Sequence, residues 1–275
     1  MYDVTRSIPM IPDKKLIRLR FEQAAATYEL HATVQHRVAE HLLALLAEAA
    51  PGLQPERILE IGCCTGLLTR RLFERFPGIR HLTVSDLVAA FETCVCRKIG
   101  PKEAEKMTFV AGDIESVRLP GRYDLIISSS TLHWVHDFPA LCGKLQRHLN
   151  PGGLFALSLY GKDNLTEIRE VTGVGLAYRN LEQLLNVMSE RFEILAAEDA
   201  REVLWYTDPL AVLRHLRATG VNSIGQKAWT RRQVKEFIQQ YQIQFGGEQG
   251  VRLTYHPMFV VARPRSEHPP AGASI

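Results

Sequence analysis

The stretch Arg57-Ile-Leu-Glu-Ile-Gly-Cys-Cys-Thr-Gly66 decides the fold of this chain. Its apolar run from Ile58 to Ile61, interrupted by one acid, predicts a buried strand of a parallel sheet. Gly62 and Gly66 follow, and glycine is favoured where the backbone needs unusual dihedral angles or approaches a ligand closely. A helix is expected from about Leu67. A strand, a glycine turn and a helix in this order are typical of doubly wound α/β folds, which bind a ligand beyond the carboxyl end of the strand.

The spacing of these glycines narrows the class of ligand. A dinucleotide site has the pattern G-x-G-x-x-G. Here the spacing is G-x-x-x-G, with Cys64 between the glycines and Glu60 before the first. This spacing disfavours a nicotinamide-dependent dehydrogenase and favours a different nucleoside cofactor.

Strands and helices alternate through the middle of the chain. Strands are predicted at 57–62, 81–85, 107–111, 123–128 and 154–160. Helices are predicted at 67–76, 88–99, 138–149 and 164–188, with a tight turn at 150–153. This alternation predicts a parallel, doubly wound sheet.

Both ends of the chain depart from this alternation. Two helices within residues 1–50 either cover the ligand site or pack on the sheet edge; a loose lead-in (1–13) precedes them, and the first carries Leu16 and Leu19. The later elements predicted are strands at 192–197 and 202–206, helices at 209–218 and 230–245, and a final strand at 251–262. We therefore expect one domain at 51–263, with a helical insertion at about 207–248 and a disordered tail at 264–275.

Composition excludes several classes of protein. The chain has 275 residues, of which 46% are hydrophobic and 23% charged, as in ordinary soluble globular proteins. Its formal net charge of +3 is too small to indicate a nucleic-acid partner. No apolar run approaches the roughly 18 residues that span a bilayer, and the N-terminus lacks a signal-peptide pattern. Five cysteines without C-x-x-C spacing predict free thiols and no metal site, so a cytoplasmic enzyme is expected.

Acidic and small residues end the strands that follow the glycine turn. Asp86 ends the second strand, where a carboxylate can bind both hydroxyls of a ribose. Asp113 ends the third strand, within reach of an adenine amino group, and Ser128 to Ser130 end the fourth. No Gly-Lys-Ser/Thr element accompanies them, so the nucleoside need not carry a phosphate. S-adenosylmethionine fits this description.

Further motifs recur in order along residues 13–263. They are Glu60-Ile-Gly-Cys-Cys-Thr-Gly66, Asp86, Gly112-Asp113, Tyr123-Asp-Leu-Ile-Ile-Ser128 and Leu149-Asn-Pro-Gly-Gly153. Together they resemble the class I S-adenosylmethionine-dependent methyltransferases. A second set is Ala25-Ala-Thr-Tyr28, His31-Ala32, Gln35, Leu132-His-Trp134, Asn164-Leu-Thr-Glu-Ile-Arg169, Trp229-Thr-Arg231 and Leu253-Thr-Tyr-His-Pro257. With these, the chain more narrowly resembles the malonyl-carrier-protein O-methyltransferases of biotin synthesis.

The resemblance implies a Rossmann-like sheet of seven strands, mostly parallel with an antiparallel last strand. It implies S-adenosylmethionine as cofactor and S-adenosylhomocysteine as product. The cofactor site that it implies consists of Gln35, Glu60, Gly62, Cys64, Gly66, Asp86, Leu87, Asp113, Ile114 and Ser129. The acceptor site that it implies consists of Tyr28, His133, Trp134 and Arg169. In that site, Arg169 is expected to clamp a carboxylate bidentately and Tyr28 to donate a hydrogen bond.

The partner that the resemblance implies is an acyl carrier protein bearing malonyl-phosphopantetheine. Carrier proteins are acidic, and the insertion offers a basic face to such a partner. Its basic residues are Arg214, Arg217, Lys227, Arg231, Arg232 and Lys235. A charged run is also what an ordinary solvated surface carries, so these residues do not by themselves identify the partner.

The chain departs from the family at three of the implied site positions. The family usually has glycine at Cys64, commonly glutamine at His133 and frequently asparagine at Ser129. A side chain in the left-handed conformation at position 64 costs about 1–2 kcal/mol and faces the cofactor. Trp134 is also consistent with an ordinary aromatic residue of the core, and Arg169 is also consistent with a solvated surface residue.

Three functions stay open on the sequence. The first is methylation of the free carboxylate of a malonyl thioester, which is ionised near neutral pH because carboxyl reference pKa values lie near 4. That reaction needs no general base, so catalysis reduces to positioning and desolvating the nucleophile. The others are methylation of another small acid or a quinone, and a non-catalytic binding protein whose cofactor site Cys64 has spoiled.

Overall fold

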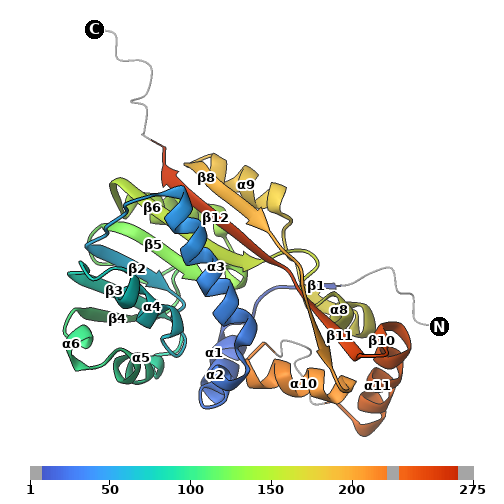
Figure 1. The fold of residues 1–275 in the computed structure, drawn as a ribbon. Coiled ribbons are helices and arrows are strands. Elements are labelled where there is room, and N and C mark those ends of the chain that lie inside the picture. Colours follow the sequence, from blue (N-terminus) through green and yellow to red (C-terminus); the bar gives the residue numbers. More distant parts are fainter. Residues whose placement is uncertain (1–7, 222–228, 266–275) are drawn as a thin grey trace.

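The computed structural model describes residues 8–221 and 229–265 (Figure 1). They form a large twisted sheet with helices on both faces and a smaller unit of helices and strands at one end. Residues 1–7 of the predicted lead-in, Lys227 of the predicted basic face, and the predicted tail from 266 onward lie outside the described residues.

Within the described residues, the main sheet has seven strands in the order β4-β3-β2-β5-β6-β12-β8. Their bounds are β2 (Arg57–Ile61), β3 (His81–Asp86), β4 (Met107–Ala111), β5 (Tyr123–Ser129), β6 (Leu149–Tyr160), β8 (Phe192–Asp199) and β12 (Pro257–Pro264). Neighbours from β4 to β6 pair in parallel, and β12 runs antiparallel to both β6 and β8. The predicted fold class is confirmed. Strand order reverses between β2 and β5, which is where such sheets bind ligands.

Helices cover both faces of the main sheet because alternate side chains of a buried strand point to opposite faces. One face packs against α3 (Thr33–Ala49), α4 (Leu67–Arg75) and α5 (Phe91–Ile99), and the other against α7 (Phe138–Arg147) and α9 (Leu181–Ser189). In β2, Ile58 belongs to the first apolar cluster and its neighbour Leu59 to the second. Both side chains are fully buried, and each burial contributes roughly 1.5–3 kcal/mol.

A smaller unit lies at one end of the main sheet (Figure 1). Its strands are β9 (Glu202–Tyr206), β10 (Gly246–Gly247) and β11 (Gly250–Tyr255), in the order β10-β11-β9. Helices α8 (Thr166–Thr172), α10 (Pro209–Ala218) and α11 (Arg231–Phe245) pack around this sheet. Helices α10 and α11 lie in the segments where the sequence predicts helices.

The final strand predicted at 251–262 is two strands, β11 and β12, in two different sheets. The chain leaves one sheet and enters the other at His256. There the backbone N–H donates to Oδ1 of Asn164 (3.2 Å), and the carbonyl accepts from the N–H of Gly161 (2.7 Å). Since both backbone groups pair outside a sheet ladder, the strand is interrupted at this residue.

Two other segments differ from the sequence prediction. The helix predicted at 164–188 is divided by β7 (Val174–Leu176), because Gly173 ends α8 with a φ of 70°. The turn predicted at 150–153 lies inside β6 as a bulge, since Leu149 pairs with Tyr123 and Leu154 with Leu125. The short elements α2 (Tyr28–His31), α6 (Pro101–Ala104) and β10 were not predicted. In the remaining described part, the boundaries of the predicted strands and helices lie close to those observed.

The N-terminal segment begins with β1 (Ile8–Met10), which pairs in parallel with β7. Residues 8–10 of the predicted lead-in are therefore a strand. Helices α1 (Lys14–Ala24) and α2 (Tyr28–His31) follow and precede α3. Within the described ranges, every helix is too short or too polar to cross a membrane.

Candidate active site

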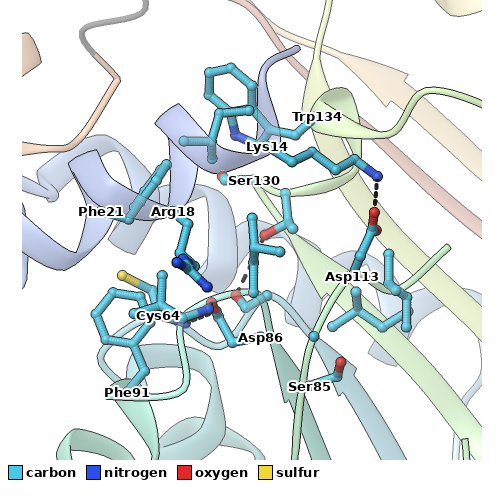
Figure 2. A pocket seen from close by; sticks show the side chains of 18 of the residues that line it. Lys14, Arg18, Phe21, Cys64, Ser85, Asp86, Phe91, Asp113, Ser130 and Trp134 are labelled. Carbon is cyan, nitrogen blue, oxygen red and sulfur yellow. Dashed lines mark hydrogen bonds and ion pairs between the residues drawn. The ribbon is translucent and has the colours of Figure 1, made fainter. Parts of the chain in front are cut away.

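A cavity of about 780 Å³ lies beyond the carboxyl ends of β2, β3, β4 and β5 (Figure 2). The predicted site residues that line it are Tyr28, Gly62, Cys64, Asp86, Leu87, Asp113, Ile114, Ser129 and Trp134. The structure thus brings most of the predicted cofactor set together, at the edge of the sheet where strand order reverses.

Gly62 occupies a position where no side chain fits. Its φ is +79°, and a Cβ atom there would lie 2.0 Å from Oγ1 of Thr131. That hydroxyl donates to the carbonyl of Ser129 (3.1 Å) and lies 3.4 Å from the carbonyl of Gly62. Gly66, with a φ of +86°, begins α4 and faces Val95. It does not line the cavity, so its part in the motif is to turn the chain into the helix.

Cys64 adopts the left-handed conformation, with a φ of 47°. For a residue with a side chain this costs about 1–2 kcal/mol. The strained turn is held by its backbone N–H, which donates to Oδ2 of Asp86 (2.9 Å). Burial raises the pKa of the thiol well above its usual value, so Cys64 presents a neutral S–H to the cavity.

Asp86 ends β3 with its carboxylate fixed by backbone donors. Oδ1 accepts from the N–H of Val88 (2.9 Å), and Oδ2 accepts from the N–H of Cys64 (2.9 Å). Burial raises the pKa of Asp86 to about 6, although these bonds favour the charged form. The side chain is therefore mostly ionised at pH 7 and can accept hydrogen bonds from a ligand.

Asp113 lies just beyond β4 and is joined to helix α1. Nζ of Lys14 is 2.6 Å from Oδ2 of Asp113 and also pairs with the carboxylate of Glu115. Glu115 in turn accepts from the backbone N–H of His136 (3.0 Å). Lys14 therefore ties the N-terminal helix to the strand end predicted to bind adenine. Sequence reasoning missed this lysine.

One face of α1 lines the cavity. Its residues there are Lys14, Ile17, Arg18 and Phe21. The spacing i, i+3, i+4, i+7 places these residues on one side of a helix. Leu19, which the apolar pattern emphasised, is instead 49% exposed. The spacing of these four residues could have indicated which face of the helix lines the cavity. Two of the four carry charge, however, so a search for apolar periodicity does not find this face.

Trp134 and His133 lie in the short helix η1 (Leu132–Trp134). Trp134 is buried and lines the cavity. The centroid of the His133 ring is 4.8 Å from that of Trp134 and 5.1 Å from that of Tyr160. Burial lowers the pKa of His133 to about 3, so the ring is neutral at pH 7. His133 packs behind the wall of the cavity and does not line it.

Arg169 lies in a second cavity, of about 370 Å³, which shares Trp134 with the first. It projects from α8, and its Nη2 donates to Oγ1 of Thr166 (3.1 Å). Tyr28 lines the first cavity and Arg169 the second. The two residues predicted to bind the methyl acceptor therefore lie in adjoining cavities, and Trp134 is in the wall of both.

Glu60 and Gln35 are buried and do not line the cavity. Alternate residues of a strand face opposite sides, and Ile61 takes the cavity side of β2, so Glu60 faces Thr69 of α4. Burial raises the pKa of Glu60 to about 8, which leaves it protonated at pH 7. Gln35 interacts with the hydroxyl of Tyr160. The sequence predicted that both side chains contact the cofactor, but in the structure neither lines the cavity.

Comparison with known proteins places the chain in a family. Residues 32–220 match a family model described as a methyltransferase domain. The malonyl-[acyl-carrier protein] O-methyltransferase of Chlorobium luteolum is 36% identical, over 94% of this chain and 98% of that protein. The protein of the same name from Haemophilus influenzae is 35% identical, over 91% of this chain and 95% of that protein. The chain belongs to the malonyl-[acyl-carrier protein] O-methyltransferase family.

Membership of this family makes the chain an S-adenosylmethionine-dependent O-methyltransferase. A methyltransferase of Bacillus halodurans has the same fold, with a TM-score of 0.58 and 15% identity over 81% of this chain and 97% of that one. Phosphoethanolamine N-methyltransferase 2 of Haemonchus contortus, solved with S-adenosylhomocysteine, has a TM-score of 0.51 and 17% identity over 82% of this chain and 53% of that one. At these identities the likeness shows the shared fold alone.

The residues of the first cavity fit S-adenosylmethionine. Asp86 and Asp113 offer carboxylate acceptors, and the hydroxyls of a ribose and the amino group of an adenine are donors. Leu87 and Phe91 provide apolar walls against which a nucleoside can pack. Gly62 lines the cavity without a side chain, so its backbone can be approached closely by a ligand. The carboxylate acceptors and apolar walls of the cavity thus agree with the cofactor that the family uses.

Proposed function

We propose that the chain transfers a methyl group from S-adenosylmethionine to the free carboxylate of a malonyl thioester on an acyl carrier protein. The methyl ester would then prime biotin (pimeloyl) synthesis. The observation that carries the proposal is the pair of cavities joined at Trp134, since the second contains an arginine within mostly apolar walls. Relatives that match almost the whole chain bear the name of this activity.

The second cavity suits a carboxylate at the end of an apolar arm. Its walls include Leu165, Ile168 and Val221, and among the lining residues that the structure describes Arg169 is the charged side chain. A guanidinium can hold a carboxylate through two parallel hydrogen bonds. Low polarity around that contact removes water from the nucleophile and strengthens the charge interaction. We assign Arg169 the role of holding the acceptor carboxylate toward Trp134 and the first cavity.

The other predicted acceptor residues fit a reaction without a general base. Bound S-adenosylmethionine supplies a methyl group made electrophilic by its sulfonium. Burial raises the pKa of Tyr28, so its hydroxyl stays protonated and can donate a hydrogen bond. His133 is neutral and packed against Trp134, so we assign it the role of fixing the indole. The acceptor carboxylate needs no deprotonation at neutral pH.

The carrier protein would dock beside α8, the helix that carries Arg169. Helix α11 packs on α8, and its first two turns present Arg231 and Lys235, which are both exposed. Their spacing of four places them on one face of the helix, suited to an acidic partner. A cytoplasmic location belongs to this proposal, because the five cysteines are free thiols.

The test of the function is transfer of a labelled methyl group to malonyl-carrier protein. We expect an alkali-labile methyl ester with the wild-type protein. Arg169→Ala should raise the KM for malonyl-carrier protein roughly 10- to 100-fold, the range expected for a charged hydrogen-bonded contact, while S-adenosylhomocysteine affinity is unchanged. Arg179→Ala is the matched control, because that guanidinium lies over Phe138 and lines neither cavity. Absence of a methyl ester from the wild-type reaction would reject the proposal.

The docking surface has a separate test. Reversing Arg231 and Lys235 to Glu should raise the KM for malonyl-carrier protein and leave that for malonyl-coenzyme A unchanged, because only the former presents an acidic protein surface. Equal changes in both KM values would reject the docking surface without affecting the proposed reaction.

A further inference from the structure

Arg18 is a cation in the wall of the cofactor cavity. It lies one helical turn after Lys14 on α1, and both line the cavity. Lys14 pairs with Asp113 and Glu115. Among the residues that the structure describes, Arg18 makes no ion pair or side-chain hydrogen bond. A charged group that lines a cavity and is left unpaired is available to a ligand.

Lys14 and Arg18 serve different ends of the cavity. Figure 2 shows Lys14 reaching Asp113 at one end, whereas Arg18 extends from α1 toward the end where Cys64 and Asp86 lie. The carboxylate of Asp86 is already held by two backbone N–H groups, so it does not need Arg18 to be satisfied. The guanidinium therefore lies near the acid assigned to the ribose and free to bind another anion.

S-adenosylmethionine carries one anionic group, the carboxylate of its methionyl part. That part is attached to the ribose and so extends from the position of Asp86, away from the adenine end at Asp113. The other charged groups lining the cavity are the two aspartates and the neutralised Lys14. Aspartates would repel a carboxylate, and a guanidinium is the donor whose planar geometry matches it.

We propose that Arg18 binds the carboxylate of the methionyl part of S-adenosylmethionine. This contact would connect α1 to the cofactor, so the bound ligand would help to hold this helix in its place in the cavity wall. Lys14 attaches the first turn of the same helix to the protein, and Arg18 attaches the second turn to the ligand. The inference rests on the cofactor and is independent of the identity of the acceptor.

The test compares two ligands by calorimetry. S-adenosylhomocysteine has the carboxylate, and S-adenosyl-3-thiopropylamine is the same molecule without it. We expect Arg18→Ala and Arg18→Met to weaken S-adenosylhomocysteine binding roughly 10- to 100-fold, and to leave binding of the decarboxylated compound unchanged. Arg18→Met keeps the apolar stem of the side chain, so it separates charge from packing. Lys15→Ala removes an exposed cation from another face of α1 and should change neither affinity.

Each other outcome overturns the proposal. Equal weakening of both ligands would show that Arg18 supports the cavity without contacting the carboxylate. No weakening of either would show that the guanidinium does not reach the ligand. Failure of the wild-type protein to bind S-adenosylhomocysteine would overturn the cofactor assignment as well. A separate result, absence of malonyl methylation by a wild-type protein that binds S-adenosylhomocysteine, would reject the proposed acceptor and would not bear on Arg18.

Discussion

Replacing Glu60 by Gln should stabilise the protein by an amount that grows with pH. Glu60 is fully buried, and burial raises its pKa from the usual 4.5 to about 8. Below pH 4.5 both the folded and the unfolded states hold the proton. Between those two pKa values only the unfolded state releases it, so the free energy of unfolding falls as pH rises. The loss is about 1.4 kcal/mol per pH unit, or about 3 kcal/mol at pH 7.

The measurement is urea unfolding of the wild-type protein and Glu60→Gln at pH 5, 6, 7 and 8. Glutamine keeps the size of the protonated acid and does not ionise. Asp86, whose pKa folding also raises, is present in both proteins, so its contribution is removed by taking the difference. That difference should be under about 1 kcal/mol at pH 5 and reach about 3 kcal/mol at pH 7. A difference independent of pH, or a less stable variant at pH 7, would refute the reasoning that burial keeps Glu60 protonated.

Two further substitutions test the glycine turn. Gly62→Ala should lower the free energy of unfolding by roughly 2–5 kcal/mol, because its Cβ would lie 2.0 Å from Thr131; Gly78→Ala, whose Cβ meets nothing within 4 Å, is the control, and equal stability in the two variants would contradict the clash. Cys64→Gly removes a strain of about 1–2 kcal/mol and adds about 0.5–1 kcal/mol of backbone entropy cost. We expect a small net stabilisation in urea unfolding and unweakened S-adenosylhomocysteine binding; loss of either would show that the Cys64 side chain contributes more than its strain costs.

The sheet could be predicted from sequence because its central strands are buried on both faces. Runs such as Leu125 to Ser128 are apolar or small throughout, and glycine or proline turns separate them from the helices. The residue types within each segment and its turns therefore indicate where these strands and helices begin and end. At the last strand, however, a tertiary contact and not the local sequence set the boundary. At His256 the backbone bonds to Asn164 and Gly161 end a strand that its own sequence would continue.

The cofactor side of the site was largely predictable, and the α1 side was not. Asp86 and Asp113 follow strands in a fixed topology, so their meeting at one sheet edge follows from the fold. Lys14 and Arg18 come from a helix whose cavity-facing side is not marked by apolar residues alone. The separation of Tyr28 from Arg169 was likewise invisible, since it depends on where Trp134 lies between two cavities.

The indole of Trp134 forms part of the wall of both cavities. Any change in its size or tilt therefore alters the space available to the cofactor and to the acceptor at once. Efforts to widen the range of accepted acids cannot treat this position as part of the acceptor pocket alone. Leu165 and Val221 line only the second cavity, so they are the positions at which acceptor selectivity can change without a matching change in cofactor affinity.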